Sequence, residues 1–148
     1  MDIGQSRRQT PPNREELCSA LSRYFGRQSD IAAAYLFGSR ARGDERRDSD
    51  IDVGLFFMES FARDPAYVLE RRATIASEIE EIFALPVDVT DLDRVSPLVF
   101  HVLFSDARLV FDADPDRRML AILRQDKLYQ DELGLMRERM EYVRRRLG

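Results

Sequence analysis

The sequence predicts an α/β fold in which helices pack on a small mixed β-sheet and a long helix ends the chain. Two apolar runs, Ile31 to Phe37 and Ile51 to Met58, have the length of buried strands and are bounded by turn residues. From Pro65 to Phe83, apolar residues recur at helical spacing. From Pro115 to Leu147, an apolar stripe with alternating three–four spacing predicts the final helix. These patterns leave the order of the strands open.

Length, charge and cysteine content limit the class of protein. A length of 148 residues is typical of a single domain. The net charge of −4 argues against sequence-independent binding of nucleic acid. A single cysteine, Cys18, allows no intrachain disulfide, which fits a reducing, cytoplasmic location. The sequence contains no apolar run of membrane-spanning length, and the polar N-terminus does not resemble a secretory signal, so we expect no membrane association.

The domain is expected to begin at residue 13. Residues 1–12 are polar and end in two prolines, which predicts a flexible tail. Asn13 can cap the first helix together with Glu16, and Gly26 can end that helix. The domain then covers residues 13–148 and includes the long helix over residues 115–147.

Two carboxylates open the second predicted strand. Asp50 and Asp52 are two residues apart, so on a strand they share one face, whereas Ile51 and Val53 point to the other. Two carboxylates on one face repel each other unless a cation lies between them. Oxygen ligands of this kind suit Mg²⁺ or Mn²⁺.

A Gly-Ser turn is predicted directly after the first strand. Gly38 allows the backbone to approach a ligand closely, Ser39 supplies a hydroxyl, and the turn can direct N–H groups at a phosphate. Arg40 and Arg42 follow at a distance suited to pairing with phosphate oxygens. A phosphate site beside a carboxylate pair is the minimum that metal-assisted nucleotidyl transfer requires.

Leu85 to Leu92 predicts a third strand that carries Asp88 between two valines. A carboxylate there is costly to bury without a partner, and a metal at Asp50 and Asp52 would be the natural partner if the strands are adjacent. Ser96-Pro97 predicts a helix to about Phe104, in which His101 is a packed residue, and a short strand follows over residues 108–111. The last helix would span about 45 Å, longer than a small domain needs, so its distal end is a candidate surface for homo- or hetero-oligomer formation.

Gly38-Ser39, ten intervening residues and Asp50-x-Asp52 together resemble the signature of the polymerase-beta-type nucleotidyltransferase superfamily. The short chain and the run Gly-Ser-Arg-Ala-Arg-Gly resemble the minimal nucleotidyltransferases (MNT), the MntA-type antitoxins of HEPN/MNT toxin–antitoxin pairs. In the superfamily a third carboxylate on a neighbouring strand completes the site. Asp88 matches that position, and Asp91 is the alternative.

The resemblance implies ATP as the donor substrate, a tyrosine hydroxyl of a cognate HEPN ribonuclease toxin as the acceptor, and AMP transfer that neutralises the toxin. Two other functions stay open. One is a small-molecule nucleotidyltransferase of the aminoglycoside-modifying kind, although those usually carry an extra helical domain. The other is an antitoxin that acts by binding alone. A polymerase or tRNA-processing role is disfavoured because the chain leaves no room for a large second domain.

Overall fold

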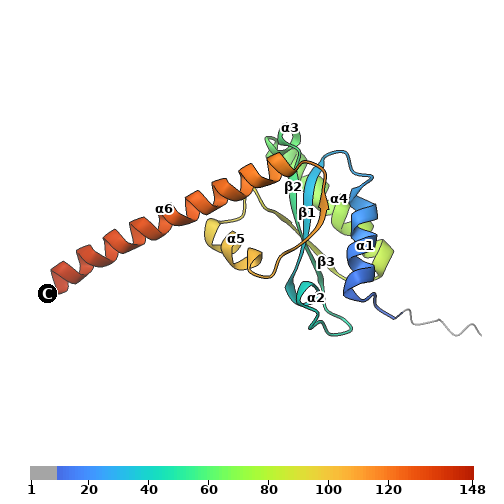
Figure 1. Ribbon diagram of the computed structural model, residues 1–148, viewed down its shortest axis with the longest axis horizontal. Helices are drawn as coiled ribbons and strands as arrows, with labels where there is room; N and C mark the ends of the chain where they lie inside the picture. The colour runs from blue at the N-terminus through green and yellow to red at the C-terminus, as the bar shows by residue number, and fades with distance from the viewer. Residues whose placement is uncertain (1–9) are drawn as a thin grey trace, which may run out of the picture.

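The computed structural model describes residues 10–148, in which four strands form one mixed sheet in the order β3-β2-β1-β4 (Figure 1). The strands are β1 (Ile31–Phe37), β2 (Ile51–Phe57), β3 (Val87–Asp91) and β4 (Arg108–Asp112). β1 runs antiparallel to both β2 and β4, whereas β2 and β3 are parallel. The predicted mixed sheet is therefore confirmed. Of the predicted tail, residues 1–9 lie outside the described residues.

Helices cover both faces of the sheet (Figure 1). On one face, α1 (Arg14–Phe25) and α4 (Pro65–Phe83) enclose the larger core, which contains Leu36, Val53 and Leu55. On the other face, α5 (Pro97–Phe104) and the first turns of α6 (Pro115–Leu147) cover an aromatic cluster. The buried members of that cluster are Ala32, Ala33, Tyr35, Phe37, Phe56, Leu92, Phe100 and Ala121.

The helices begin at the residues that the sequence predicts. The Asn13 side chain accepts a hydrogen bond from the Glu16 backbone N–H at 2.9 Å. Asp64, Ser96 and Asp114 each cap a helix, and each is followed by proline at the first helical position. Proline suits that position because its missing N–H would have no partner inside the helix.

Two short helices were not predicted. The chain forms α2 (Gly38–Arg42) where the sequence indicates a Gly-Ser turn, and α3 (Glu59–Ala62) follows β2. Gly38 has φ of 71°, which lets the chain leave β1 directly into α2, and Gly43, with φ of 79°, ends it. Helices of four or five residues are too short to show an amphipathic repeat, so the sequence pattern does not reveal them.

The C-terminal helix extends far beyond the sheet (Figure 1). Its 33 residues confirm the predicted range, and its buried residues are Ala121 and Gln125, both in the first third. Within residues 10–148, no helix combines the length and apolar character needed to cross a membrane.

Candidate active site

The carboxylates predicted on the second and third strands lie on adjacent strands. In the parallel pairing of β2 with β3, Asp52 is directly opposite Asp88. In the antiparallel pairing with β1, Asp52 is opposite Phe37, the last residue before α2. Side chains directly opposite each other share a face of the sheet. Asp52 and Asp88 therefore lie on the same face of the sheet, at the end where β2 and β3 begin. Farther along the strands, α5 and α6 cover this face.

Gly38 packs directly against Asp52. A Cβ atom at residue 38 would lie 2.5 Å from Asp52 Oδ2, closer than real Cβ contacts allow. The positive φ of Gly38 also disfavours any other residue there. The sequence therefore needs glycine at this position both to start α2 and to bring its backbone against the carboxylate.

The acidic groups act on one another electrostatically. Burial raises the pKa of Asp52, and the negative charges of Asp88 and Asp50 raise it further. The positive charge of Arg42 acts in the opposite direction on the pKa of Asp52. A carboxyl group whose pKa three charged neighbours influence is a candidate functional residue.

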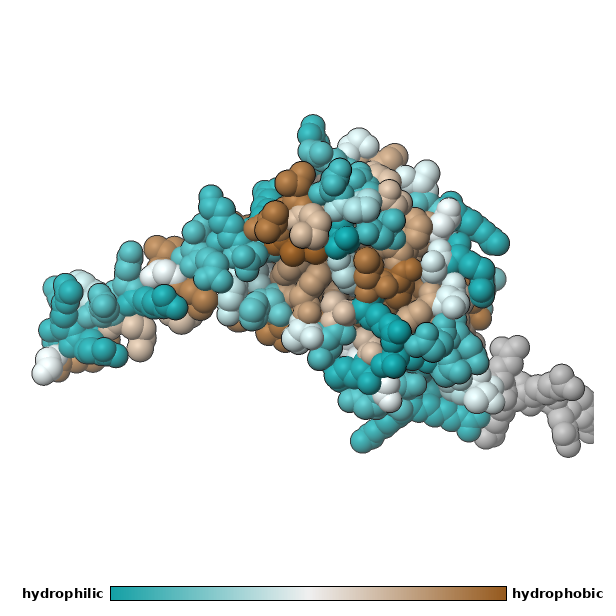
Figure 2. Space-filling model, in the orientation of Figure 1, coloured by the Kyte–Doolittle hydropathy of each residue, from teal (hydrophilic) through white to brown (hydrophobic). Residues whose placement is uncertain are grey.

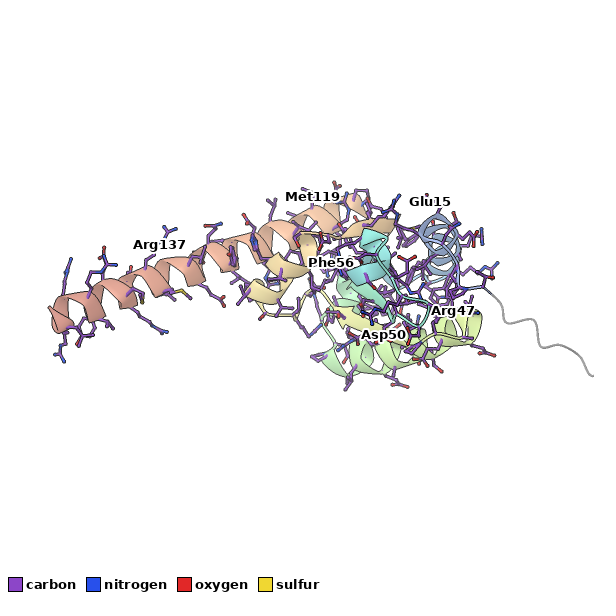
Figure 3. The ribbon with its side chains drawn as sticks, turned by 90° about the horizontal axis from the view of Figure 1, so that it is seen from below. Glu15, Arg47, Asp50, Phe56, Met119 and Arg137 are labelled. Atoms are coloured by element: carbon purple, nitrogen blue, oxygen red, sulfur yellow. The ribbon has the colours of Figure 1, made fainter. Side chains whose placement is uncertain are left out.

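Asp50 lies just before β2 rather than within it, and its side chain is exposed. It ends the connector that links α2 to β2, and Figure 3 shows it near Arg47 at one end of the sheet. Within this connector, the Arg46 N–H donates to Ser49 Oγ at 2.7 Å, and the Ser49 N–H donates to the Arg46 carbonyl. The local turn thus fixes the segment that presents Asp50.

Arg40, which the sequence predicts to contact phosphate, is buried and hydrogen-bonded to the connector. Its side chain is only 1% exposed. Its Nε donates to the Ser49 carbonyl at 2.9 Å, and Nη2 donates to the Arg47 carbonyl at 3.4 Å. Because the guanidinium is buried and bonded to the connector, we assign Arg40 to positioning Asp50. Sequence reasoning missed this role, since the carbonyls that need a donor belong to an irregular loop.

Arg42 keeps its side chain accessible at the site. It lies 3.2 Å from Asp44 and 3.6 Å from Asp106, and its side chain is 44% exposed. Asp106 comes from the loop after α5, so this pair links α2 to a distant part of the chain. No pattern in the sequence indicates Asp106, because only the fold brings it near residue 42.

Asp91 and Asp93 are both engaged elsewhere. Asp91 is 4% exposed, pairs with Arg94 at 2.8 Å and accepts a hydrogen bond from the Asp93 N–H. Asp93 forms an ion pair with Arg117. These contacts occupy the alternative carboxylate, Asp91, and favour Asp88 as the third member of the site.

The donor set at this site fits a hard divalent cation. The oxygens of Asp50, Asp52 and Asp88 are the ligand type that Mg²⁺ and Mn²⁺ prefer, and a cation would relieve the repulsion that raises the pKa of Asp52. In the described part of the chain, however, three such side chains are not yet gathered closely enough to hold an ion. Asp50 and Asp88 are both exposed, so neither side chain is packed in the protein interior.

Two other features lie apart from the carboxylates. A cavity of about 600 Å³ is lined by Arg94, Arg117 and other charged residues. Arg117 donates to the carbonyl of Phe57, the last residue of β2, so this cavity is at the opposite end of the strand from Asp52. His101 stacks on Tyr129 with ring centroids 4.2 Å apart, which agrees with a packed histidine.

Comparison with protein families gives one match. Residues 19–116 match the family model described as Polymerase beta, Nucleotidyltransferase. This range covers about two thirds of the chain and includes α2, the connector and all three candidate carboxylates. A search of curated proteins gives no significant match.

Solved structures share the fold at low sequence identity. A toxin–antitoxin structure with AMP-PNP aligns with a TM-score of 0.62 and 20% identity over 93% of this chain and 100% of that chain. The tri-AMPylated Shewanella oneidensis HEPN toxin in complex with MNT antitoxin aligns with a TM-score of 0.58 and 17% identity, over 91% of this chain and 99% of that chain. The toxin–antitoxin MntA–HepT aligns with a TM-score of 0.55 and 19% identity, over 91% of this chain and 97% of that chain. The similarity includes the long final helix, since nearly the whole chain is aligned.

Proposed function

Because the chain belongs to the polymerase-beta-type nucleotidyltransferase family, we propose that it transfers AMP from ATP to a tyrosine hydroxyl of a HEPN ribonuclease toxin and so acts as the antitoxin. The observation that carries the proposal is the pairing of Asp52 with Asp88 beside Gly38. This pairing brings together carboxylates that can bind a metal and, at Gly38, a backbone that a phosphate can approach closely.

Asp50, Asp52 and Asp88 would hold Mg²⁺ or Mn²⁺. When bound, the metal supplies charge neutralisation for the triphosphate and acidifies the acceptor hydroxyl. The raised pKa of Asp52 supports this assignment, because an acidic cluster that is strained without a cation is a favourable site for one.

The remaining residues bind the donor and move the proton. The Ser39 hydroxyl and the backbone at Gly38 bind phosphate oxygens, and Arg42 exchanges its exposed carboxylate partners for the triphosphate. The tyrosine oxygen forms a bond to the α-phosphorus, the bond from that phosphorus to the bridging oxygen breaks, and pyrophosphate leaves. Asp88 accepts the tyrosine proton.

The choice of acceptor rests on the relatives. One matched structure contains a tri-AMPylated HEPN toxin with its MNT antitoxin, and another contains AMP-PNP. Both align with nearly all of this chain, which supports a similar pairing of donor and acceptor.

The double substitution Asp50→Asn and Asp52→Asn tests the proposal against an antitoxin that acts by binding alone. The variant and the wild type are each co-expressed with a HEPN partner, and toxin inhibition and complex formation are measured together. We expect the variant to bind the partner but to lose antitoxin action. A variant that binds and still neutralises the partner would contradict the enzymatic proposal.

A kinetic experiment tests the phosphate contact at Ser39. We expect Ser39→Ala to lower kcat/KM for ATP by roughly tenfold or more, since a hydrogen bond to a charged group contributes about 1.5–3 kcal/mol. The unfolding midpoint should change little because Ser39 is only partly buried. Equal kcat/KM in both proteins would exclude the contact.

A further inference from the structure

The projecting part of α6 exposes a continuous row of apolar side chains. Beyond Gln125, this helix has no buried residue. Large side chains are nevertheless spaced alternately three and four residues apart along it. They are Tyr129, Leu133, Met136, Met140, Val143 and Leu147, and we call this row the distal seam. Its first member, Tyr129, also stacks on His101 of α5. Met136 and Met140 are 61% and 60% exposed. Figure 2 shows apolar patches along this part of the helix between hydrophilic ones.

A helix of this length has little stability without packing. An isolated helix in water is marginal, and most helical stability in proteins comes from burial of an apolar face. Gly134 lies in the middle of the distal seam with nothing within 4 Å of where its Cβ would be, and glycine costs about 1 kcal/mol in a helix relative to alanine. The spacing of the seam is that of a coiled-coil interface, in which a second helix covers the row.

The charges beside the distal seam are mostly positive. In a heptad repeat, the flanking positions on one side are Gln130, Arg137 and Arg144, and those on the other are Glu132, Arg139 and Arg146. Figure 3 shows Arg137 on the projecting part of the helix. Four of these six positions are arginines, so the edges of the seam attract acidic side chains.

A second copy of this chain is a poor occupant. Each copy offers one acidic flanking residue, Glu132, for four arginines. In a parallel pair Glu132 would lie opposite Arg137 of the other copy, but Arg139 would lie opposite Arg144. In an antiparallel pair Arg137 and Arg144 would lie near Arg137 and Arg144 of the other copy. A membrane surface also fits poorly. The side of the helix opposite the seam carries three acidic residues, Asp131, Glu138 and Glu141, and one arginine, Arg145, whereas a helix on anionic lipid needs mostly cations there.

We propose that the distal seam docks an amphipathic helix of a partner protein whose apolar face is flanked by aspartate or glutamate. The apolar rows would interlock, and the acidic flanks would pair with Arg137, Arg139, Arg144 and Arg146. This surface lies far along α6 from β2, the strand that contains Asp52, so it would hold a partner at a place separate from the chemistry (Figure 1). That it would hold the acceptor of AMP transfer rests on the proposed function.

Two synthetic peptides of four heptads test the docking rule without any need for nucleotide. Both carry leucine at the core positions. One carries glutamate at the flanking positions and the other lysine. Fluorescence anisotropy with the full chain should give binding of the glutamate peptide at least tenfold tighter than of the lysine peptide. Equal binding, or tighter binding of the lysine peptide, would overturn the proposal. So would a concentration-dependent dimer of the chain, or tighter binding to phosphatidylglycerol vesicles than to the glutamate peptide.

A charge-reversal variant makes the test specific. The double variant Arg137→Glu with Arg144→Glu should bind the glutamate peptide roughly tenfold more weakly and the lysine peptide roughly tenfold more tightly than the wild type does. The matched control is Lys127→Glu with Arg145→Glu, which changes the net charge equally at positions that face away from the seam. The control should keep the wild-type preference, and an equal reversal by the control would overturn the proposal. Because no AMP transfer is involved, a failure here is distinct from a failure of the proposed function.

Discussion

At the scale of single residues, the site gathers like charges where the fold would be more stable without them. Asp52 is half-buried, faces Asp88 across the strand pair and touches the backbone of Gly38. Burial and the two neighbouring carboxylates raise the pKa of Asp52, so its ionised form opposes folding. Groups retained at a cost to stability are typical of functional sites.

Replacing Asp52 should therefore stabilise the protein at neutral pH. Because the pKa of Asp52 is raised in the folded state, the wild type loses stability as the pH rises from the ordinary carboxyl pKa to the raised pKa. The loss persists at higher pH. We expect Asp52→Asn to gain about 0.5 kcal/mol near pH 7. The gain should fade near pH 3, where the wild-type carboxyl is protonated. Urea unfolding at both pH values measures this, and a variant less stable than wild type at pH 7 would contradict it.

Gly38 should be intolerant of a side chain. Gly38→Ala places a Cβ 2.5 Å from Asp52 Oδ2 at a residue with positive φ, so we expect a loss of roughly 1–2 kcal/mol in unfolding free energy. The matched control is Gly134→Ala on exposed helix, which should gain about 1 kcal/mol. Thermal unfolding of both variants provides the comparison. A tolerated alanine at residue 38 would show that the close contact is not required.

At the scale of elements, the connector between α2 and β2 explains how the site is assembled. It presents Asp50, and its carbonyls are held by the buried Arg40. The sequence predicted the strands, the capped helices and the shared face of the core residues, because these follow from spacing and local capping. It did not predict α2 or the role of Arg40, since both depend on how an irregular segment folds back. The contact of Arg42 with Asp106 depends on tertiary structure in the same way.

The two arginines of α2 should respond differently to substitution. Arg40→Ala removes the donors to the Ser49 and Arg47 carbonyls and should cost roughly 1–3 kcal/mol. Arg42→Ala should leave the free energy of unfolding nearly unchanged, because exposed ion pairs contribute little, but should raise KM for ATP. Urea unfolding and steady-state kinetics on both variants separate the roles. Equal destabilisation by the two substitutions would contradict this division.

At the scale of the whole molecule, a globular body carries the chemistry and a projecting helix carries the distal seam (Figure 1). The sequence predicted the full length of the helix, which the structure confirms, and the use of its distal end as a partner surface stays a prediction. The prediction was possible because the three–four spacing is a local property. The point at which the helix leaves the body was not predictable, since it depends on how α5 and α6 cover the sheet.

Truncation after Gln130 tests this division. The removed residues include no buried side chain, so the body should keep its unfolding midpoint within a few degrees. Binding of the glutamate peptide should be lost. A large drop in the midpoint, measured by thermal unfolding, would show that the distal half stabilises the body.

We propose that the chain transfers AMP to a tyrosine of a HEPN toxin. The most direct measurement is mass spectrometry of a purified HEPN partner after incubation with ATP and Mg²⁺, with the wild type, with the Asp50→Asn and Asp52→Asn double variant, or alone. We expect one or more AMP units on a tyrosine with the wild type only. An unmodified partner that still forms a stable complex with the wild type would contradict the claim and identify an antitoxin that acts by binding.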